Sequence, residues 1–101
     1  MIVEHIRYVL TDHKPEDVIA GYEAAAEHLQ AAPECLGYEL TQCVEEPNVF
    51  LLTTRWTSAG DHMQGFRRGP NFPPFLAAIR PFVGEIAEMR HYRQTDLVWQ
   101  R

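Results

Sequence analysis

Polar and apolar side chains alternate through residues 1–10, a pattern that predicts a β-strand. Glu4 shares one face of this strand with Ile6 and Tyr8, while His5 lies on the other face. Apolar residues occur on both faces, so we expect both faces to be covered in the folded protein.

Three more strands follow from the same kind of pattern. We predict them over residues 35–46, 48–56 and 85–94, each rich in β-branched, aromatic or alternating apolar residues. Glu46-Pro47-Asn48 has the composition of a turn, so the second and third strands should form a hairpin.

Helical periodicity appears between the first two strands. A helix should open at residues 14–17, because Pro15 suits a first helical turn and two acidic residues follow it at the positive end of the helix dipole. Pro33 should close the helix. Its apolar positions recur at helical spacing: Val18, Tyr22, Ala25, Ala26 and Leu29.

The segment after Trp56 predicts two shorter helical pieces. Ser58 and Asp61 resemble a capping box in its acidic form, and this first piece should end at residues 69–70, a Gly-Pro pair. Asn71 can cap the second piece. The apolar stripe of that piece is Phe72, Phe75, Leu76, Ile79 and Phe82.

The resulting order β-α-β-β-α-β predicts an α+β fold of the ferredoxin-like type, one antiparallel four-stranded sheet with two helices on one face. We expect a single domain over residues 1–101, with a core over 1–93 and a C-terminal tail over 94–101. The helices can cover only one face, so the other face should pack against a second copy of the sheet in a homodimer.

Composition narrows the classes of partner. The chain has 101 residues, a net charge of -5 and no run of Lys or Arg, so we expect no nucleic-acid partner. Charged residues interrupt the apolar N-terminal segment, which favours a cytoplasmic protein with no signal peptide and no membrane span. Cys35 and Cys43 lie too far apart along one predicted strand for a disulfide and should be reduced thiols.

The histidines and cysteines show none of the spacings HxxxH, HxH or CxxC, so we expect no metal site. No cofactor-binding motif is recognisable, and we expect no cofactor. His5 and His91 fall on the first and fourth strands, where they should face the partner subunit, and His13 and His28 should lie at the surface.

Four stretches carry a resemblance to a known family: MIVEHIRY at the start, CLGYEL before the hairpin, RWTS after the third strand, and FRRGPNFPPFLAAIRPF leading to EMRHY. Over residues 1–93, their order and spacing resemble the antibiotic biosynthesis monooxygenase family of the dimeric α+β barrel superfamily. The resemblance implies a dimer with its two sheets face to face, and a pocket in each monomer between sheet and helices. Some members oxygenate polycyclic phenols or quinols without metal or flavin.

Other relatives in that superfamily degrade haem. The resemblance aligns their strand-one Asn with Ile6 and their helical His with Phe75 or Leu76, so only a Trp like Trp56 is retained. We therefore expect no haem degradation by this chain.

Trp56 and His62 are the candidate catalytic residues. A neutral imidazole can accept a proton near neutral pH, and an indole N–H can donate a hydrogen bond. The alternatives are a Trp56 that simply fills the core and a His62 that is solvated on its helix. Aromatic residues that could bind a flat substrate, or only pack the core, are Tyr8, Tyr22, Tyr38, Phe66, Phe72 and Phe75.

Charged residues within the predicted strands would be costly to bury alone, so we interpret them as members of ion pairs in the interface or barrel interior and not as catalytic groups. They are Glu4, Arg7, Glu39, Arg55 and Arg90.

The leading hypothesis is a cofactor-independent monooxygenase that acts on an aromatic small metabolite of phenolic, quinol or anthrone-like type. Such chemistry needs a dry aromatic pocket, a base and donors for a phenolate, because the deprotonated substrate itself reduces oxygen. Two alternatives stay open: a non-catalytic barrel that binds a small ligand, and an isomerase or lyase on the same fold.

Overall fold

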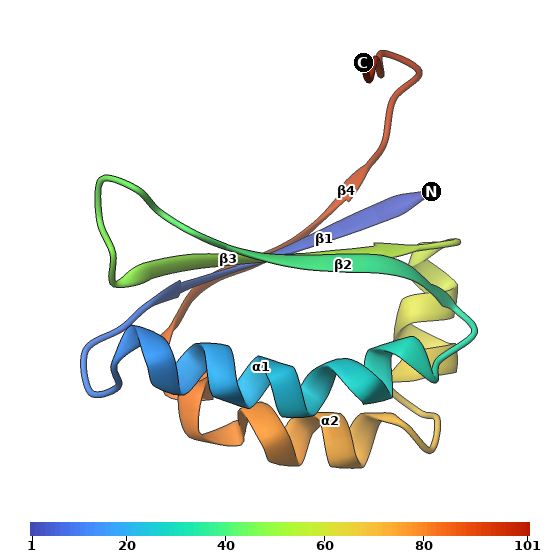
Figure 1. Cartoon of the computed structure of the whole chain (residues 1–101). Coiled ribbons are helices and arrows are strands. Elements are labelled where there is room, and N and C mark those ends of the chain that lie inside the picture. Colours follow the sequence, from blue (N-terminus) through green and yellow to red (C-terminus); the bar gives the residue numbers. More distant parts are fainter.

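A computed structural model describes the backbone of residues 1–101 and every side chain except those of Asp61 and Met63. Two helices lie side by side on one face of a single sheet (Figure 1). The main elements are β1 (Ile2–Val9), α1 (Pro15–Gln30), β2 (Cys35–Gln42), β3 (Val49–Trp56), α2 (Phe72–Ile79) and β4 (Ile86–Arg93). A π-helical turn over Asp61–Phe66 precedes α2, and a 3-10 helix over Arg80–Glu85 follows it.

The strands are ordered β2-β3-β1-β4 and all neighbouring pairs are antiparallel, which confirms the predicted ferredoxin-like α+β fold. The predicted helix after residue 14 is also confirmed. Pro15 occupies its first turn, and the Asp17 carboxylate accepts a hydrogen bond of 3.0 Å from the Lys14 backbone N–H. The second strand is shorter than predicted and ends at Gln42.

The register of β1 decides which side chains face the helices. Glu4 lies opposite Thr54 on β3 and opposite His91 on β4. Cross-strand partners point to the same face of a sheet, so these three side chains lie together under the helices. His91 was expected to face a partner subunit, and the structure instead places it on this helix-covered face.

The core fills the layer between sheet and helices. Its largest fully buried side chains are Trp56, Tyr8, Phe50, Leu29 and Leu52. Gly21 lets α1 approach the segment after α2 closely, because a Cβ at this position would lie 2.6 Å from the ring of Phe82.

The open face of the sheet is less apolar than the sequence pattern suggested. Val3, Val9 and Leu51 alternate there with charged and polar side chains. Arg55 Nη2 pairs with Glu39 Oε1 at 3.3 Å, as expected for charges within the strands. The tail over 94–101 extends beyond β4 on the side away from the helices (Figure 1). Its Leu97, Val98 and Trp99 are exposed.

Glu85, the last residue of the 3-10 helix, binds the loop between β1 and α1 through its carboxylate. Its Oε2 accepts hydrogen bonds from the backbone N–H groups of Thr11 at 2.6 Å and Asp12 at 3.0 Å, and its Oε1 contacts Nδ1 of His13. His13 is therefore a partly buried partner of Glu85 and not the surface residue that was expected.

Cys35 and Cys43 are both free, as expected. Among the described residues, no helix has the length and apolar character needed to cross a membrane.

Candidate active site

A cavity of about 210 Å³ lies between the sheet and the helical segments after β3. Hydrocarbon and aromatic side chains form most of its wall. Among the side chains that the structure describes, the polar ones on the wall are Glu4, Thr54, His62 and Arg67. A mostly apolar cavity with a few convergent polar groups is the usual form of a small-molecule site.

Trp56 forms part of the cavity wall at the end of β3, and only 1% of it is exposed. Its ring centroid lies 4.5 Å from that of His62 and 5.0 Å from that of Phe66. The indole Nε1–H donates a hydrogen bond of 2.7 Å to Thr54 Oγ1. The indole N–H is therefore already hydrogen-bonded within the protein, and the part of Trp56 that a ligand could contact is its ring surface.

His62 is buried in the π-helical turn, with 3% of its side chain exposed. That turn closes through a hydrogen bond of 3.2 Å from the Arg67 backbone N–H to the His62 carbonyl. The alternative of a solvated helix histidine is therefore excluded. The capping box predicted for Ser58 and Asp61 depends on the Asp61 side chain, which lies outside the described residues.

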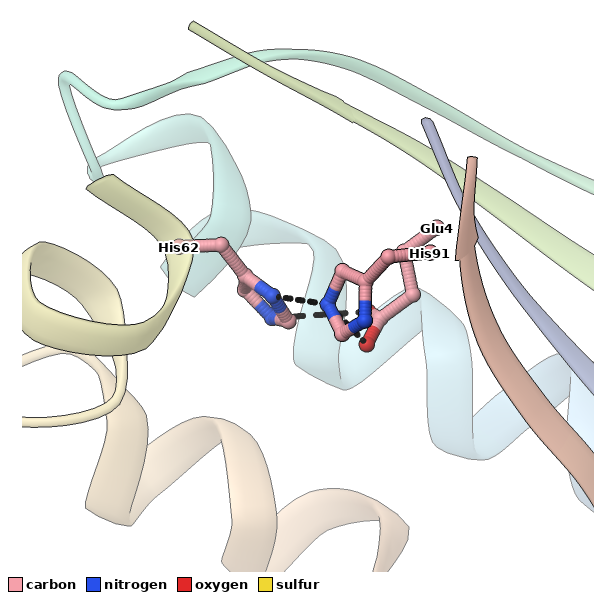
Figure 2. Close-up of side chains that lie close together, drawn as sticks. All are labelled: Glu4, His62 and His91. Carbon is pink, nitrogen blue, oxygen red and sulfur yellow. Dashed lines mark hydrogen bonds and ion pairs between the residues drawn. The ribbon is translucent and has the colours of Figure 1, made fainter. Parts of the chain in front are cut away.

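Both ring nitrogens of His62 have partners on the sheet (Figure 2). Its Nδ1 lies 2.7 Å from Nε2 of His91, within hydrogen-bonding distance. Its Nε2 lies 3.4 Å from Oε1 of Glu4. The histidine therefore comes from a helical turn, while its two partners come from the adjacent strands β1 and β4.

Glu4 is the most unusual group in the cavity. Its side chain is 4% exposed, and Oε1 accepts a long hydrogen bond of 3.4 Å from Thr54 Oγ1. Oε2 lies 3.3 Å from His91 Nε2 and 3.7 Å from Arg67 Nη2. Among the described side chains, Oε2 is nevertheless the buried polar atom that receives no hydrogen bond.

Burial sets the protonation of this cluster. It raises the pKa of Glu4 to about 7, although Arg67 and the Thr54 hydrogen bond act in the opposite direction. Burial also lowers the pKa of His62 to about 4, helped by the positive charge of Arg67 and by His91. Charge pairing would shift both groups the other way, so desolvation outweighs the attraction between them, and His62 is neutral at pH 7.

The predicted aromatic residues fall into two groups. Phe66, Phe72 and Phe75 line the cavity. The three tyrosines do not line it: Tyr8 and Tyr22 share a buried hydrogen bond of 2.5 Å, and the Tyr38 hydroxyl accepts one of 2.6 Å from Gln30. Burial raises the pKa of Tyr8 to about 12 and raises the pKa of Tyr22 as well. Tyr22 and Tyr38 instead line a separate, more open groove beside α1.

Three ionisable members of the site were not predicted as such. Glu4 was interpreted as a member of an ion pair in the interface or barrel interior, and the structure does give it ion-pair partners. His91 was expected to face the partner subunit, and no role in a site was predicted for Arg67. A charged residue on the apolar face of β1 was the available signal for Glu4. The spacing test for metal ligands also missed the cluster, because Glu4, His62 and His91 lie far apart in sequence, yet each brings one donor atom within 4.8 Å of the others.

Comparisons with known proteins agree with the fold. A curated relative from Bacillus subtilis strain 168, the uncharacterized protein YczJ, is 29% identical over 70 residues, which cover 63% of this chain and 74% of the relative. A candidate antibiotic biosynthesis monooxygenase from Bordetella bronchiseptica is 23% identical, with a TM-score of 0.74 and coverage of 93% of this chain and 96% of the other.

SnoaB, a cofactor-independent oxygenase from Streptomyces nogalater, is 18% identical, with a TM-score of 0.71 and coverage of 96% of this chain and 97% of the other. At these identities the solved structures establish a shared fold. The sequence model of the antibiotic biosynthesis monooxygenase family matches residues 1–80, which is most of the chain. The chain belongs to the antibiotic biosynthesis monooxygenase family.

Proposed function

We propose that the protein is a cofactor-independent monooxygenase of a small, electron-rich hydroxylated aromatic compound. The observation that carries this proposal is the placement of His62: a buried, neutral imidazole that lines an aromatic cavity and is held by His91 and Glu4. The family and the fold shared with the SnoaB oxygenase support the reaction class.

In the proposed reaction, Nε2 of His62 accepts the phenolic proton of the substrate, because Nδ1 is held by His91, and the Glu4 carboxylate 3.4 Å away stabilises the imidazolium that forms. The phenolate transfers one electron to O₂, and the resulting radical pair combines to form a C–O bond at a ring carbon that bears hydrogen. Loss of that hydrogen as a proton and cleavage of the O–O bond then release water. One oxygen atom becomes the new carbonyl of a quinone and the other becomes water, so the substrate supplies all the electrons.

The size of the cavity sharpens the substrate class. An apolar cavity of about 150 Å³ accommodates a single benzene ring. The cavity here is about 210 Å³, which favours one or two fused rings over the three rings of an anthrone. Phe66, Phe72 and Trp56 would stack on the ring faces and edges, and Arg67 would stabilise the phenolate that forms when the proton leaves.

The proposal includes a homodimer through the open face of the sheet, and a cytoplasmic location. Partly buried Val3, Val9 and Leu51 on this face, together with exposed Trp99 on the tail, support a protein partner there. Light scattering at micromolar concentration tests the dimer, and a monomer would contradict it.

Oxygen uptake with a panel of one-ring and two-ring hydroquinones and naphthols tests the activity. We expect uptake to form a quinone that carries one atom of ¹⁸O from ¹⁸O₂. His62→Gln should slow turnover by ~10²-fold or more, as expected for loss of a positioned base. His28→Gln, on α1 and away from the cavity wall, is the matched control and should leave turnover unchanged.

Binding is measured separately by fluorescence. The chain contains two tryptophans, so Trp99→Phe leaves Trp56 as the sole indole reporter. Quenching of Trp56 without oxygen uptake by any member of the panel would contradict the oxygenase and favour the non-catalytic binding barrel.

A further inference from the structure

We propose that Glu4, His62 and His91 form a binding site for a late first-row divalent cation, with Zn²⁺ as its reference ion. This cation competes with the substrate proton for Nε2 of His62. The competition rests on the proposed function, because it assigns a regulator to the same base. The cation site itself rests on geometry alone.

The donor set suits such an ion. Two imidazoles and one carboxylate are typical ligands of zinc, iron, cobalt and nickel, whereas magnesium and calcium prefer all-oxygen sites. Three protein ligands also leave a coordination position open, as in catalytic zinc sites. Here that position would face the cavity, because Glu4 and His62 both line its wall.

The distances are compatible with coordination. Donors bound to one tetrahedral zinc ion at ~2.1 Å lie roughly 3.4 Å from one another. Taking one donor atom from each of the three residues, these atoms lie within 4.8 Å of one another, and Glu4 Oε2 lies 3.3 Å from His91 Nε2. An ion binds only one nitrogen of an imidazole. His62 Nε2 already lies 3.4 Å from Glu4 Oε1, so the His62 ring would turn away from its 2.7 Å contact through Nδ1 with His91 when Nε2 binds the ion.

A second observation points to a ligand at this place. Glu4 Oε2 is buried and receives no hydrogen bond, although it lies between His91 and Arg67. A buried carboxylate oxygen without a hydrogen bond destabilises a fold, and a bound cation would remove that cost. His91 has 32% of its side chain exposed, which gives an ion a route from solvent to the cluster.

Titration of the metal-free protein with Zn²⁺, followed by calorimetry, tests the site. We expect one saturable ion per chain, no competition from Mg²⁺, and at least a tenfold loss of affinity in Glu4→Gln and in His91→Gln. The matched control is His5→Gln, since His5 lies beside Glu4 on β1 but bonds to Thr53 on the opposite face of the sheet. Affinity that survives both cluster variants, or falls equally in His5→Gln, would overturn the site.

A measurement on the unmodified protein avoids dependence on variants that fail to fold. Long-range ¹H–¹⁵N spectra report the ring nitrogens of all five histidines, and Zn²⁺ should shift those of His62 and His91. Shifts confined to His5, His13 and His28, or no shift at millimolar Zn²⁺, would overturn the site.

Turnover measured against Zn²⁺ occupancy tests the competition. Turnover should fall in proportion to occupancy and return on chelation, and a rise would overturn the competition. Zinc binding at the cluster in a protein without oxygen uptake would contradict the proposed function and leave the site standing. Oxygen uptake without zinc binding would do the reverse.

Discussion

The burial of His62 predicts a large loss of stability in His62→Ala. The imidazole is 3% exposed, packs 4.5 Å from the Trp56 ring centroid and lines the cavity, so its removal enlarges that cavity by about the volume of the ring. Ring-to-Ala substitutions in cores cost about 3–5 kcal/mol, and a smaller, polar ring should fall near the low end. Loss of the 2.7 Å contact with His91 adds ~1 kcal/mol, while relaxation of the desolvated cluster offsets part of the total.

We therefore expect His62→Ala to lower the free energy of unfolding by about 3 kcal/mol. For a domain of this size, that loss corresponds to a melting temperature lower by roughly 12–24 °C. The assay is urea unfolding at one fixed protein concentration, because a dimer would make the apparent stability concentration-dependent. His28→Ala is the matched control, since its side chain is 24% exposed and pairs with exposed Glu27 at 3.4 Å, and it should change stability by less than ~1 kcal/mol.

Two results would refute this reasoning. A loss below about 1 kcal/mol in His62→Ala, similar to that in His28→Ala, would mean that the imidazole is not packed in the core. An equal and large loss in His62→Phe, which refills most of the volume, would mean that hydrogen bonds and not packing dominate.

Three further predictions concern Arg67, Glu85 and Trp56. Arg67→Gln removes a positive charge 3.7 Å from Glu4 Oε2, so Zn²⁺ should bind several-fold tighter, and unchanged affinity by calorimetry would contradict the electrostatic argument. Burial opposes ionisation of Glu85, but hydrogen bonds from His13 and the adjoining backbone lower its pKa to about 2. The stability advantage over Glu85→Gln should therefore persist above pH 4.5 and disappear as pH falls toward 2 in urea titrations. Trp56→Phe should weaken an aromatic ligand by about 1 kcal/mol in calorimetry, and unchanged binding would remove Trp56 from the pocket.

The arrangement of elements was predictable because each rests on local patterns. Alternation over residues 1–10 gave β1, Pro15 and Asp17 marked the start of α1, and the turn at residues 46–48 joined β2 to β3. These signals depend on a few neighbouring residues, so tertiary contacts had little to override. Helical spacing likewise identified Phe72 and the rest of the α2 stripe as inward-facing.

The face of β4 could not be predicted in the same way. Its pairing with β1 shifts by one residue between Arg7 and Tyr8. Ile86 before the shift and both Met89 and His91 after it therefore face inward, although strict alternation would put Ile86 on the opposite face from the other two. A shift of one residue turns every later side chain to the other face, and no local pattern in this strand announces it. The inward direction of His91 is therefore a property of the assembled sheet.

The burial of His62 was hidden for a different reason. A histidine in a short polar segment is normally predicted to be exposed. Here it lies in the π-helical turn over Asp61–Phe66, and its side chain is only 3% exposed. The direction of the Glu4 side chain was easier to predict, because the alternation of the first strand already placed it on the same face as Ile6 and Tyr8. Its charge led to its interpretation as a member of an ion pair in the interface or barrel interior and not as a catalytic group.

A comparison of the two buried glutamates separates structure from function. Glu85 accepts two backbone hydrogen bonds and contacts His13, and its pKa is lowered to about 2, as expected of a carboxylate that holds a loop in place. Glu4 is equally buried, yet one of its oxygens receives no hydrogen bond and its pKa is raised to about 7. A hydrocarbon side chain in place of Glu4, like that of the neighbouring Ile6, would make the fold more stable. Natural proteins tend to break local rules of this kind at functional sites, so the unsatisfied carboxylate supports the proposed site at Glu4, His62 and His91.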